Sequence, residues 1–85
     1  MSLIVNMRSF IVIFGERVKE IRLARGLTQQ DLADQARLNR SYIGEIEIGR
    51  RNVTLLTMSR LATALNVPLH TLLIASKHDS NNDKG

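Results

Sequence analysis

The sequence predicts an all-α domain of five helices, and three observations lead to that prediction. Apolar residues recur at spacings of three and four positions in successive segments of the chain. Residues that suit the first turn of a helix, Thr28, Asn39 and Thr54, stand at the boundaries of those segments. No segment shows the strict alternation of apolar and polar residues that indicates a half-buried β-strand.

The composition is that of one small, basic domain. A chain of 85 residues forms a single domain and buries only about 60–65% of its unfolded surface, so a partner subunit would add stability. The formal net charge of +4 favours a polyanionic partner, although many basic domains simply stay soluble in this way.

The residue composition also excludes several kinds of binding site and predicts where the protein is located. The sequence has no cysteine, which excludes disulfides and thiolate metal sites, and we expect no cofactor. His70 and His78 are not accompanied by further ligands at metal-binding spacing. The longest apolar run near the start, Phe10 to Phe14, is too short for a membrane span or a signal-peptide core, which predicts a cytoplasmic protein.

The first helix is predicted over residues 9–25. Four apolar residues recur on one of its faces: Phe10, Phe14, Val18 and Ile21. Gly26 follows and suits the left-handed conformation in which many helices end. Residues 1–8 are set apart as an N-terminal extension, in part an expression tag.

Two short helices separated by a tight turn are predicted next. The first opens at Thr28, with Asp31 completing its cap, and the second opens at Asn39 after a turn over residues 36–38. Five residues face inward: Leu32, Ala33, Ala36, Ile43 and Ile46. Four point outward from the second helix: Arg40, Ser41, Gly44 and Glu45. A core-backed helix that presents arginine, serine and glutamate has the side chains that read bases in the major groove of DNA.

The last two helices follow a loop over residues 49–53. Thr54 caps the fourth helix and Asn66 ends it, while Pro68 fits the first turn of the fifth. The fourth helix carries Leu55, Met58, Leu61, Ala62 and Leu65 on one face, and the fifth carries Leu69, Leu72, Leu73 and Ile74. Residues 76–85 contain almost nothing to bury and are predicted to be a disordered tail.

The stretch from residue 27 to residue 51 resembles the helix-turn-helix of Cro/repressor-like (XRE-type) regulators. The matching residues are Leu27, Thr28, Gln29, Leu32, Ala33, Ile43, Glu47 and Gly49. The flanking segments Met7–Phe10, Phe14–Gly15, Arg40–Gly44 and Arg51–Leu56 are similar to the controller proteins of restriction–modification systems. The resemblance covers residues 7–74 and implies a five-helix, lambda-repressor-like DNA-binding domain. The main departure is Arg37, where the family usually carries glycine in a left-handed conformation; arginine there costs on the order of 1 kcal/mol or adds a phosphate contact.

The resemblance and the chemistry of the outward face together give candidates for base reading. Arg40 is the best of them, because its guanidinium can donate to guanine O6 and N7 together. Ser41 can reach a base or a phosphate. Glu45 matches a base-reading glutamine of phage repressors and could accept from cytosine N4, or it could act only by repelling the wrong DNA. Tyr42 could contact a phosphate or a thymine methyl, or simply be half-buried.

A second set of residues is expected to hold the DNA backbone: Gln29, Arg50, Arg51, Asn52 and Thr54. Such contacts supply affinity and salt dependence rather than sequence information. The resemblance also implies a structural ion pair between Arg22 and Glu47, which would fix the reading helix to the first helix.

Residues 9–75 are therefore predicted to form a DNA-binding and dimerisation domain. We expect Leu69, Leu72 or Leu73 to be buried between the subunits of a homodimer; the alternative is that they complete the core of the single chain. The partners expected are a second copy and double-stranded DNA with an inverted-repeat operator, in association with the nucleoid, and no membrane or small-molecule ligand.

The leading hypothesis is a sequence-specific transcription regulator that controls a restriction–modification operon. The alternatives are a phage-type repressor and, from a different class, an antitoxin that binds a toxin and DNA secondarily. An enzyme is not expected, because the sequence shows no pairing of a nucleophile with a base and no phosphate-binding glycine loop.

Overall fold

The computed structural model describes the backbone of residues 3–75 and the side chains of residues 9–75. Between residues 3 and 75 the chain forms five helices and no strand, as the sequence predicts. The helices are α1 (Leu3–Ala24), α2 (Gln29–Ala36), α3 (Arg40–Glu47), α4 (Leu55–Leu65) and α5 (Leu69–Leu72). The tail expected from residue 76 onward lies outside the described residues.

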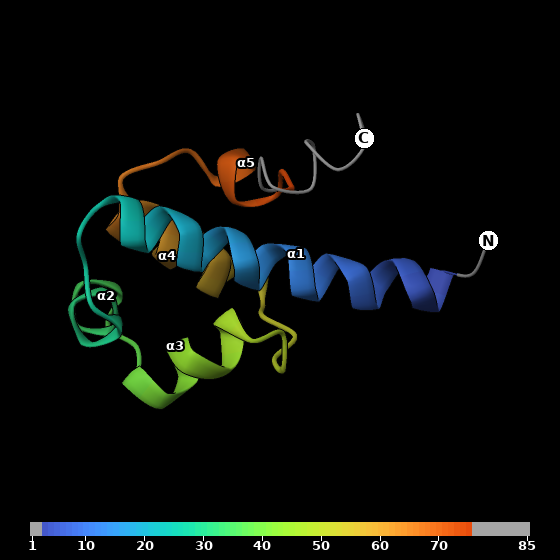
Figure 1. Cartoon of the computed structure of the whole chain (residues 1–85), viewed down its shortest axis with the longest axis horizontal. Helices are drawn as coiled ribbons and strands as arrows, with labels where there is room; N and C mark the ends of the chain where they lie inside the picture. The colour runs from blue at the N-terminus through green and yellow to red at the C-terminus, as the bar shows by residue number, and fades with distance from the viewer. Residues whose placement is uncertain (1–2, 76–85) are drawn as a thin grey trace.

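The long α1 is the central element of the fold, and its first turns extend beyond the other helices (Figure 1). It contacts α3 on one side and α4 and α5 on the other, while α2 bridges α3 and α4. The largest fully buried side chains come from all five helices: Val18, Leu32, Ile43, Ile46, Leu61, Leu65 and Leu72. Each buried side chain of this size stabilises the fold by about 1.5–3 kcal/mol relative to exposure.

The ends of the central helices form as their capping residues predict. The Thr28 hydroxyl accepts from the backbone N–H of Asp31, and the Asp31 carboxylate accepts from the backbone N–H of Thr28. These hydrogen bonds hold the pKa of the Asp31 carboxyl below its usual value, and the bond from the Thr28 backbone has the largest effect. Asn39 and Thr54 cap α3 and α4 by accepting from backbone N–H groups of the first turn, those of Ser41 and Tyr42 in α3 and that of Thr57 in α4.

Arg37 adopts the left-handed conformation that the resemblance implies, with φ 59° and ψ 47°. Its backbone N–H donates to the carbonyls at the end of α2, Ala33 and Asp34. Asn66 ends α4 with nearly the same angles. The turn of the helix-turn-helix therefore keeps its geometry with arginine in place of glycine.

The N-terminal boundary of α1 differs from the prediction. The helix begins at Leu3 rather than at Ser9, because residues 3–8 contain no glycine or proline to end it. Phe10, which shares an apolar face with Phe14 by its spacing, is 44% exposed. It precedes Phe14 by one turn, and Phe14 is the first described side chain of α1 that enters the core.

The last helix is shorter than predicted and changes part of the dimer hypothesis. Helix α5 ends at Leu72, Pro68 is its N-cap rather than part of its first turn, and Leu73 and Ile74 lie beyond its end. Leu72 is fully buried within the single chain, so the expectation that it lies between subunits is wrong. On α4, Leu55 has the spacing of the apolar face but is 68% exposed, because it is the first helical residue and the buried part of that face begins further along the helix. Between residues 3 and 75 no helix combines the length and apolar character needed to cross a membrane.

The crossing of α1 and α3 leaves no space for a side chain at Gly15. A Cβ atom there would collide with the carbonyl oxygen of Ile46 and lie 3.1 Å from its carbonyl carbon. Gly15→Ala is therefore expected to lower the free energy of unfolding by about 1–3 kcal/mol, because the helix backbones must separate. Urea denaturation followed by circular dichroism measures this change.

Gly44 on α3 provides the matched control. A Cβ atom at this position meets only the Gln29 side chain, at 3.7 Å. Gly44→Ala should raise the free energy of unfolding by up to about 1 kcal/mol through helix propensity. Equal destabilisation by the two substitutions would contradict the close crossing.

Candidate nucleic-acid interface

Helix α3 presents a polar face because its opposite face is fixed in the core. Ile43 and Ile46 are 0% and 1% exposed, whereas Arg40 and Ser41 in the first turn are exposed. Asn39 starts the helix by accepting from the backbone N–H of Ser41 at 2.7 Å. The first turn of α3 is thus held rigidly while its side chains remain accessible.

Tyr42 and Glu45, the other two base-reading candidates, are both engaged by Arg51. The guanidinium carbon of Arg51 lies 5.2 Å from the centre of the Tyr42 ring, and Arg51 Nε donates to Glu45 Oε1 at 2.7 Å. Tyr42 is half-buried against the core, which was one of its expected states. This cluster could not be predicted from the sequence, because residues 45 and 51 do not share a helical spacing.

The loop between α3 and α4 carries most of the residues expected to contact the DNA backbone. Arg50, Arg51 and Asn52 are exposed there, beside the polar face of α3. Thr54 is exposed too, but its hydroxyl caps α4 by accepting from the backbone N–H of Thr57. A cleft of about 580 Å³ runs between this loop and α1, lined by Ile11, Val12, Ile48, Gly49, Arg50, Arg51 and Asn52.

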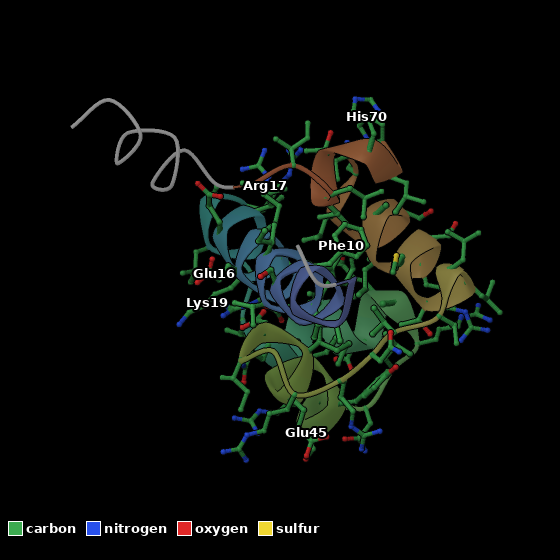
Figure 2. All side chains as sticks on the ribbon, turned by 90° about the vertical axis from the view of Figure 1, so that its right-hand side faces the viewer. Phe10, Glu16, Arg17, Lys19, Glu45 and His70 are labelled. Atoms are coloured by element: carbon green, nitrogen blue, oxygen red, sulfur yellow. The ribbon has the colours of Figure 1, made fainter. Side chains whose placement is uncertain are left out.

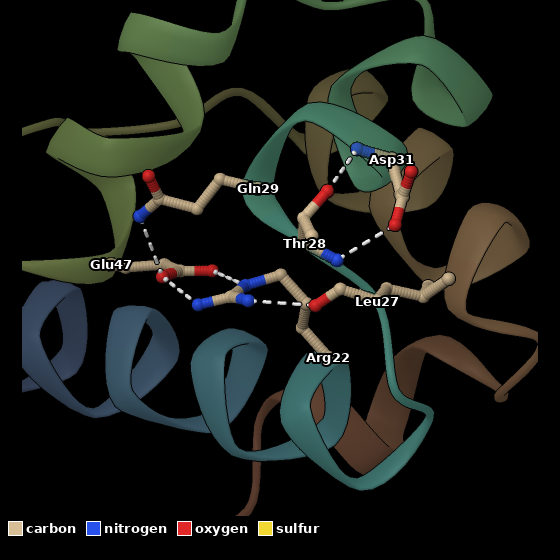
Figure 3. A network of polar contacts seen from close by, with 6 residues as sticks. All are labelled: Arg22, Leu27, Thr28, Gln29, Asp31 and Glu47. Carbon is tan, nitrogen blue, oxygen red and sulfur yellow. Dashed lines mark hydrogen bonds and ion pairs between the residues drawn. The ribbon is translucent and has the colours of Figure 1, made fainter.

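Arg22 and Glu47 form the ion pair that the resemblance implies, and it is buried. Arg22 Nε and Nη2 donate to the two carboxylate oxygens of Glu47 at 2.7 and 3.0 Å, and Nη1 donates to the Leu27 carbonyl at 2.8 Å (Figure 3). The two side chains are 8% and 2% exposed. The pair therefore ties α1 to the end of α3 and to the segment that precedes α2.

Gln29 takes part in the same network, a role that the sequence did not predict. Its side-chain amide donates to Glu47 Oε1 at 3.1 Å (Figure 3). The amide of this residue, which is expected to contact a phosphate, thus also joins α2 to α3. The Glu47 carboxylate consequently accepts from α1 and α2 together.

The polar face of α3 and the loop that follows it form one basic edge of the molecule. Figure 2, viewed along α1, shows Glu45 at this edge, His70 of α5 at the opposite edge, and Glu16 and Lys19 on a third side. Among side chains described between residues 9 and 75, no group of three His, Asp or Glu residues is placed to hold a metal ion. The arrangement suits a groove of DNA, with base-facing groups on the helix and cationic groups on the flanking loop.

The burial of the ion pair gives a test of its structural role. Glu47→Ala leaves the Arg22 guanidinium buried without its counterion, and should lower the free energy of unfolding by about 3–5 kcal/mol. Glu20→Ala is the control, because Glu20 pairs with Arg17 at 40% side-chain exposure and its loss should cost less than about 1 kcal/mol. Comparable losses for the two variants in urea denaturation would show that the buried pair has no special role.

Comparisons with known proteins agree with this geometry. A helix-turn-helix family model matches residues 18–72. The control protein C.SmaI of Serratia marcescens is 40% identical over 73 residues, which are 86% of this chain and 84% of that protein. The immunity repressor of Bacillus phage phi105 is 42% identical over 59 residues, 69% of this chain but only 41% of the repressor.

Solved structures of controller proteins are similar as well. The restriction–modification controller protein C.AhdI from Aeromonas hydrophila matches with a TM-score of 0.72 and 47% identity, over 73% of this chain and 94% of that one. The controller protein C.Esp1396I, a tetramer in complex with its natural 35 base-pair operator, matches with a TM-score of 0.70 and 33% identity. That match covers 74% of this chain and 83% of C.Esp1396I.

These relatives are regulators and not enzymes, in agreement with the prediction from the sequence. The family model spans α2, the turn and α3, together with the C-terminal part of α1 and all of α4 and α5. The chain therefore belongs to the helix-turn-helix family of transcriptional regulators, in which it is a relative of the restriction–modification controller proteins.

Proposed function

We propose that this protein is a sequence-specific transcriptional regulator, the controller of a restriction–modification operon, which binds an inverted-repeat operator as a homodimer. The observation that carries the proposal is the exposed first turn of α3, with Arg40 and Ser41 accessible and Ile43 and Ile46 buried beneath them. The similarity to C.SmaI and C.AhdI over most of their lengths supports the controller assignment. Such a protein acts in the cytoplasm, at the nucleoid.

Helix α3 supplies the base-reading groups in this proposal. Arg40 donates to guanine O6 and N7, and Ser41 contacts a neighbouring base or phosphate. Tyr42 offers its exposed edge to a thymine methyl or its hydroxyl to a phosphate. Glu45 faces the same groove and can accept from cytosine N4 once Arg51 has moved away from its carboxylate.

The residues proposed to bind the DNA phosphate backbone flank this helix on both sides. Arg50, Arg51 and Asn52 follow α3 on an exposed loop, and Gln29 and Thr54 stand near the N-termini of α2 and α4. Helix N-termini attract phosphate because their free N–H groups point outward. Two such surfaces, related by a two-fold axis and about 34 Å apart, would address half-sites one helical turn apart.

Dimerisation is proposed to use the C-terminal end of the domain. Leu69 and Leu73 are only half-buried against the core, and Ile74 is 52% exposed. Leu69 begins α5, and Leu73 and Ile74 directly follow its end. This helix carries His70 at the edge opposite Glu45 (Figure 2). The operator-bound tetramer of C.Esp1396I shows that a relative assembles on DNA.

A phage-type repressor is the second candidate, favoured by the 42% identity to the phi105 immunity repressor. The two candidates share the DNA-binding mechanism and differ in the genes they control. Sequencing the DNA that the protein occupies in its host would separate them, because a controller binds upstream of restriction and modification genes.

Base reading by Arg40 is tested by selection from a pool of random duplexes, read by sequencing. The wild-type protein should enrich an inverted repeat. Arg40→Ala should lose preference at one base pair of each half-site, worth about 1–3 kcal/mol of discrimination. Arg50→Ala is the matched control: it should weaken all duplexes alike and reduce the slope of log K against log salt by about 0.9. An unchanged preference in Arg40→Ala would refute the assignment.

The dimer surface is tested by sedimentation. Ile74→Asp should convert the dimer to a monomer without loss of helix content, because the side chain is exposed in the single chain. Leu23→Asp is the control, since Leu23 is 57% exposed on α1 and its replacement should leave the dimer intact. A dimer of unchanged affinity in Ile74→Asp would place the interface elsewhere.

A further inference from the structure

The ion pair between Glu45 and Arg51 joins two residues that the proposed function uses for different purposes. Glu45 lies on the base-reading helix and Arg51 lies on the loop expected to hold phosphate. The two side chains remain 43% and 54% exposed, so the pair is open to solvent and to DNA. Neither the family model nor the similarity to other controllers assigns a role to this contact.

The backbone of the loop brings Arg51 back alongside α3. Gly49 has φ 77° and its N–H donates to the Ile46 carbonyl at 3.1 Å, while the Arg50 N–H donates to the Glu45 carbonyl at 2.9 Å. These bonds reverse the chain directly after α3. Val12 of α1 packs on Gly49, where an added Cβ atom would lie 3.0 Å from Val12 Cγ2. The return of Arg51 toward the helix is therefore built into the loop.

Two independent contacts then fix the guanidinium of Arg51. Its Nε donates to Glu45 Oε1 at 2.7 Å, and its guanidinium carbon lies over the Tyr42 ring, 5.2 Å from the ring centre. Arg40, Arg50 and Arg51 are the three arginines of this edge, and within residues 9–75 only Arg51 among them has a carboxylate partner. Of the two loop arginines expected to bind phosphate, Arg50 and Arg51, Arg51 is thus already paired with a carboxylate of the same chain.

We infer that Glu45 is an internal competitor of DNA phosphate for Arg51 and thereby a specificity-determining residue. On DNA of arbitrary sequence, Arg51 stays with Glu45. Without Arg51, the Glu45 carboxylate would be an unpaired negative charge beside the negatively charged DNA. On the operator, a base that donates to Glu45 takes the place of Arg51, and Arg51 turns to the phosphate backbone. Phosphate binding by Arg51 is in this way made conditional on the base that faces Glu45.

The inference rests on the proposed function, because it concerns the same interface. It differs from simple repulsion of DNA by the Glu45 charge in one measurable respect. Repulsion acts whether or not Arg51 is present, whereas competition requires Arg51. A pair of variants in two backgrounds therefore separates the two mechanisms.

The experiment measures the binding of a mixed-sequence duplex as a function of salt for wild type, Glu45→Gln, Arg51→Gln and the double variant. Glu45→Gln should bind this duplex about two- to fivefold more tightly than wild type, because Arg51 is released to bind phosphate. This gain corresponds to the strength of one exposed ion pair. The slope of log K against log salt concentration should be steeper by about 0.9 for this variant, which is the effect of one additional phosphate contact. In the Arg51→Gln background the same substitution should change neither quantity.

Glu16→Gln provides the control for net charge, since Glu16 is exposed on a different side of the molecule (Figure 2). An equal gain from Glu45→Gln in both backgrounds would overturn the inference in favour of direct repulsion, and no gain in either would also overturn it. Both outcomes leave the proposed function in place. A wild-type protein that binds no duplex at any salt concentration would instead refute the proposed function and this inference together.

Discussion

The buried ion pair between Arg22 and Glu47 is the interaction on which the rest of the structure depends. Three of the four polar contacts in this network end on the Glu47 carboxylate, which lies at the last residue of α3. Desolvation makes a lone buried charge costly, so α1, α2 and α3 are held in one arrangement that satisfies both partners. The position of the reading helix is thus determined by chemistry at its inner end, away from the DNA.

A division of roles along α3 follows from this anchoring. The C-terminal end of the helix is fixed by Glu47, and the middle by Ile43 and Ile46 in the core. Only the N-terminal turn and the outer face are left to vary without loss of the fold. Glu45 lies on this outer face, 43% exposed, and is close enough to the following loop to bind Arg51.

The fold was largely predictable from the sequence because its signals are local. Thr28, Asn39 and Thr54 each cap a helix through a contact within three residues, and such contacts are visible as spacing. The burial of Leu72 within the single chain was not predictable. An apolar residue in a C-terminal helix gives the same sequence pattern whether it is buried in the core of its own subunit or between two subunits. The N-terminal start of α1 was missed since residues 3–8 carry no signal that begins a helix.

For the candidate interface, the sequence names residues but not the contacts that they make with one another. The resemblance implies that Arg40, Glu45 and Arg51 share one surface. The structure exposes Arg40 on the first turn of α3 and brings Arg51 into contact with Glu45. The pairing of Arg51 with Glu45, like the bond from Gln29 to Glu47, depends on how a loop or a neighbouring helix folds back. Neither has a sequence spacing that identifies it.

The close crossing of α1 and α3 at Gly15 has a consequence for the DNA itself. Because the two backbones are in contact there, α3 cannot slide or tilt to follow an imperfect groove. Adjustment during docking must come from the duplex, whose bending and groove width depend on its sequence. The stiffness of base pairs that no side chain touches, such as those between two half-sites, then becomes part of what the protein recognises.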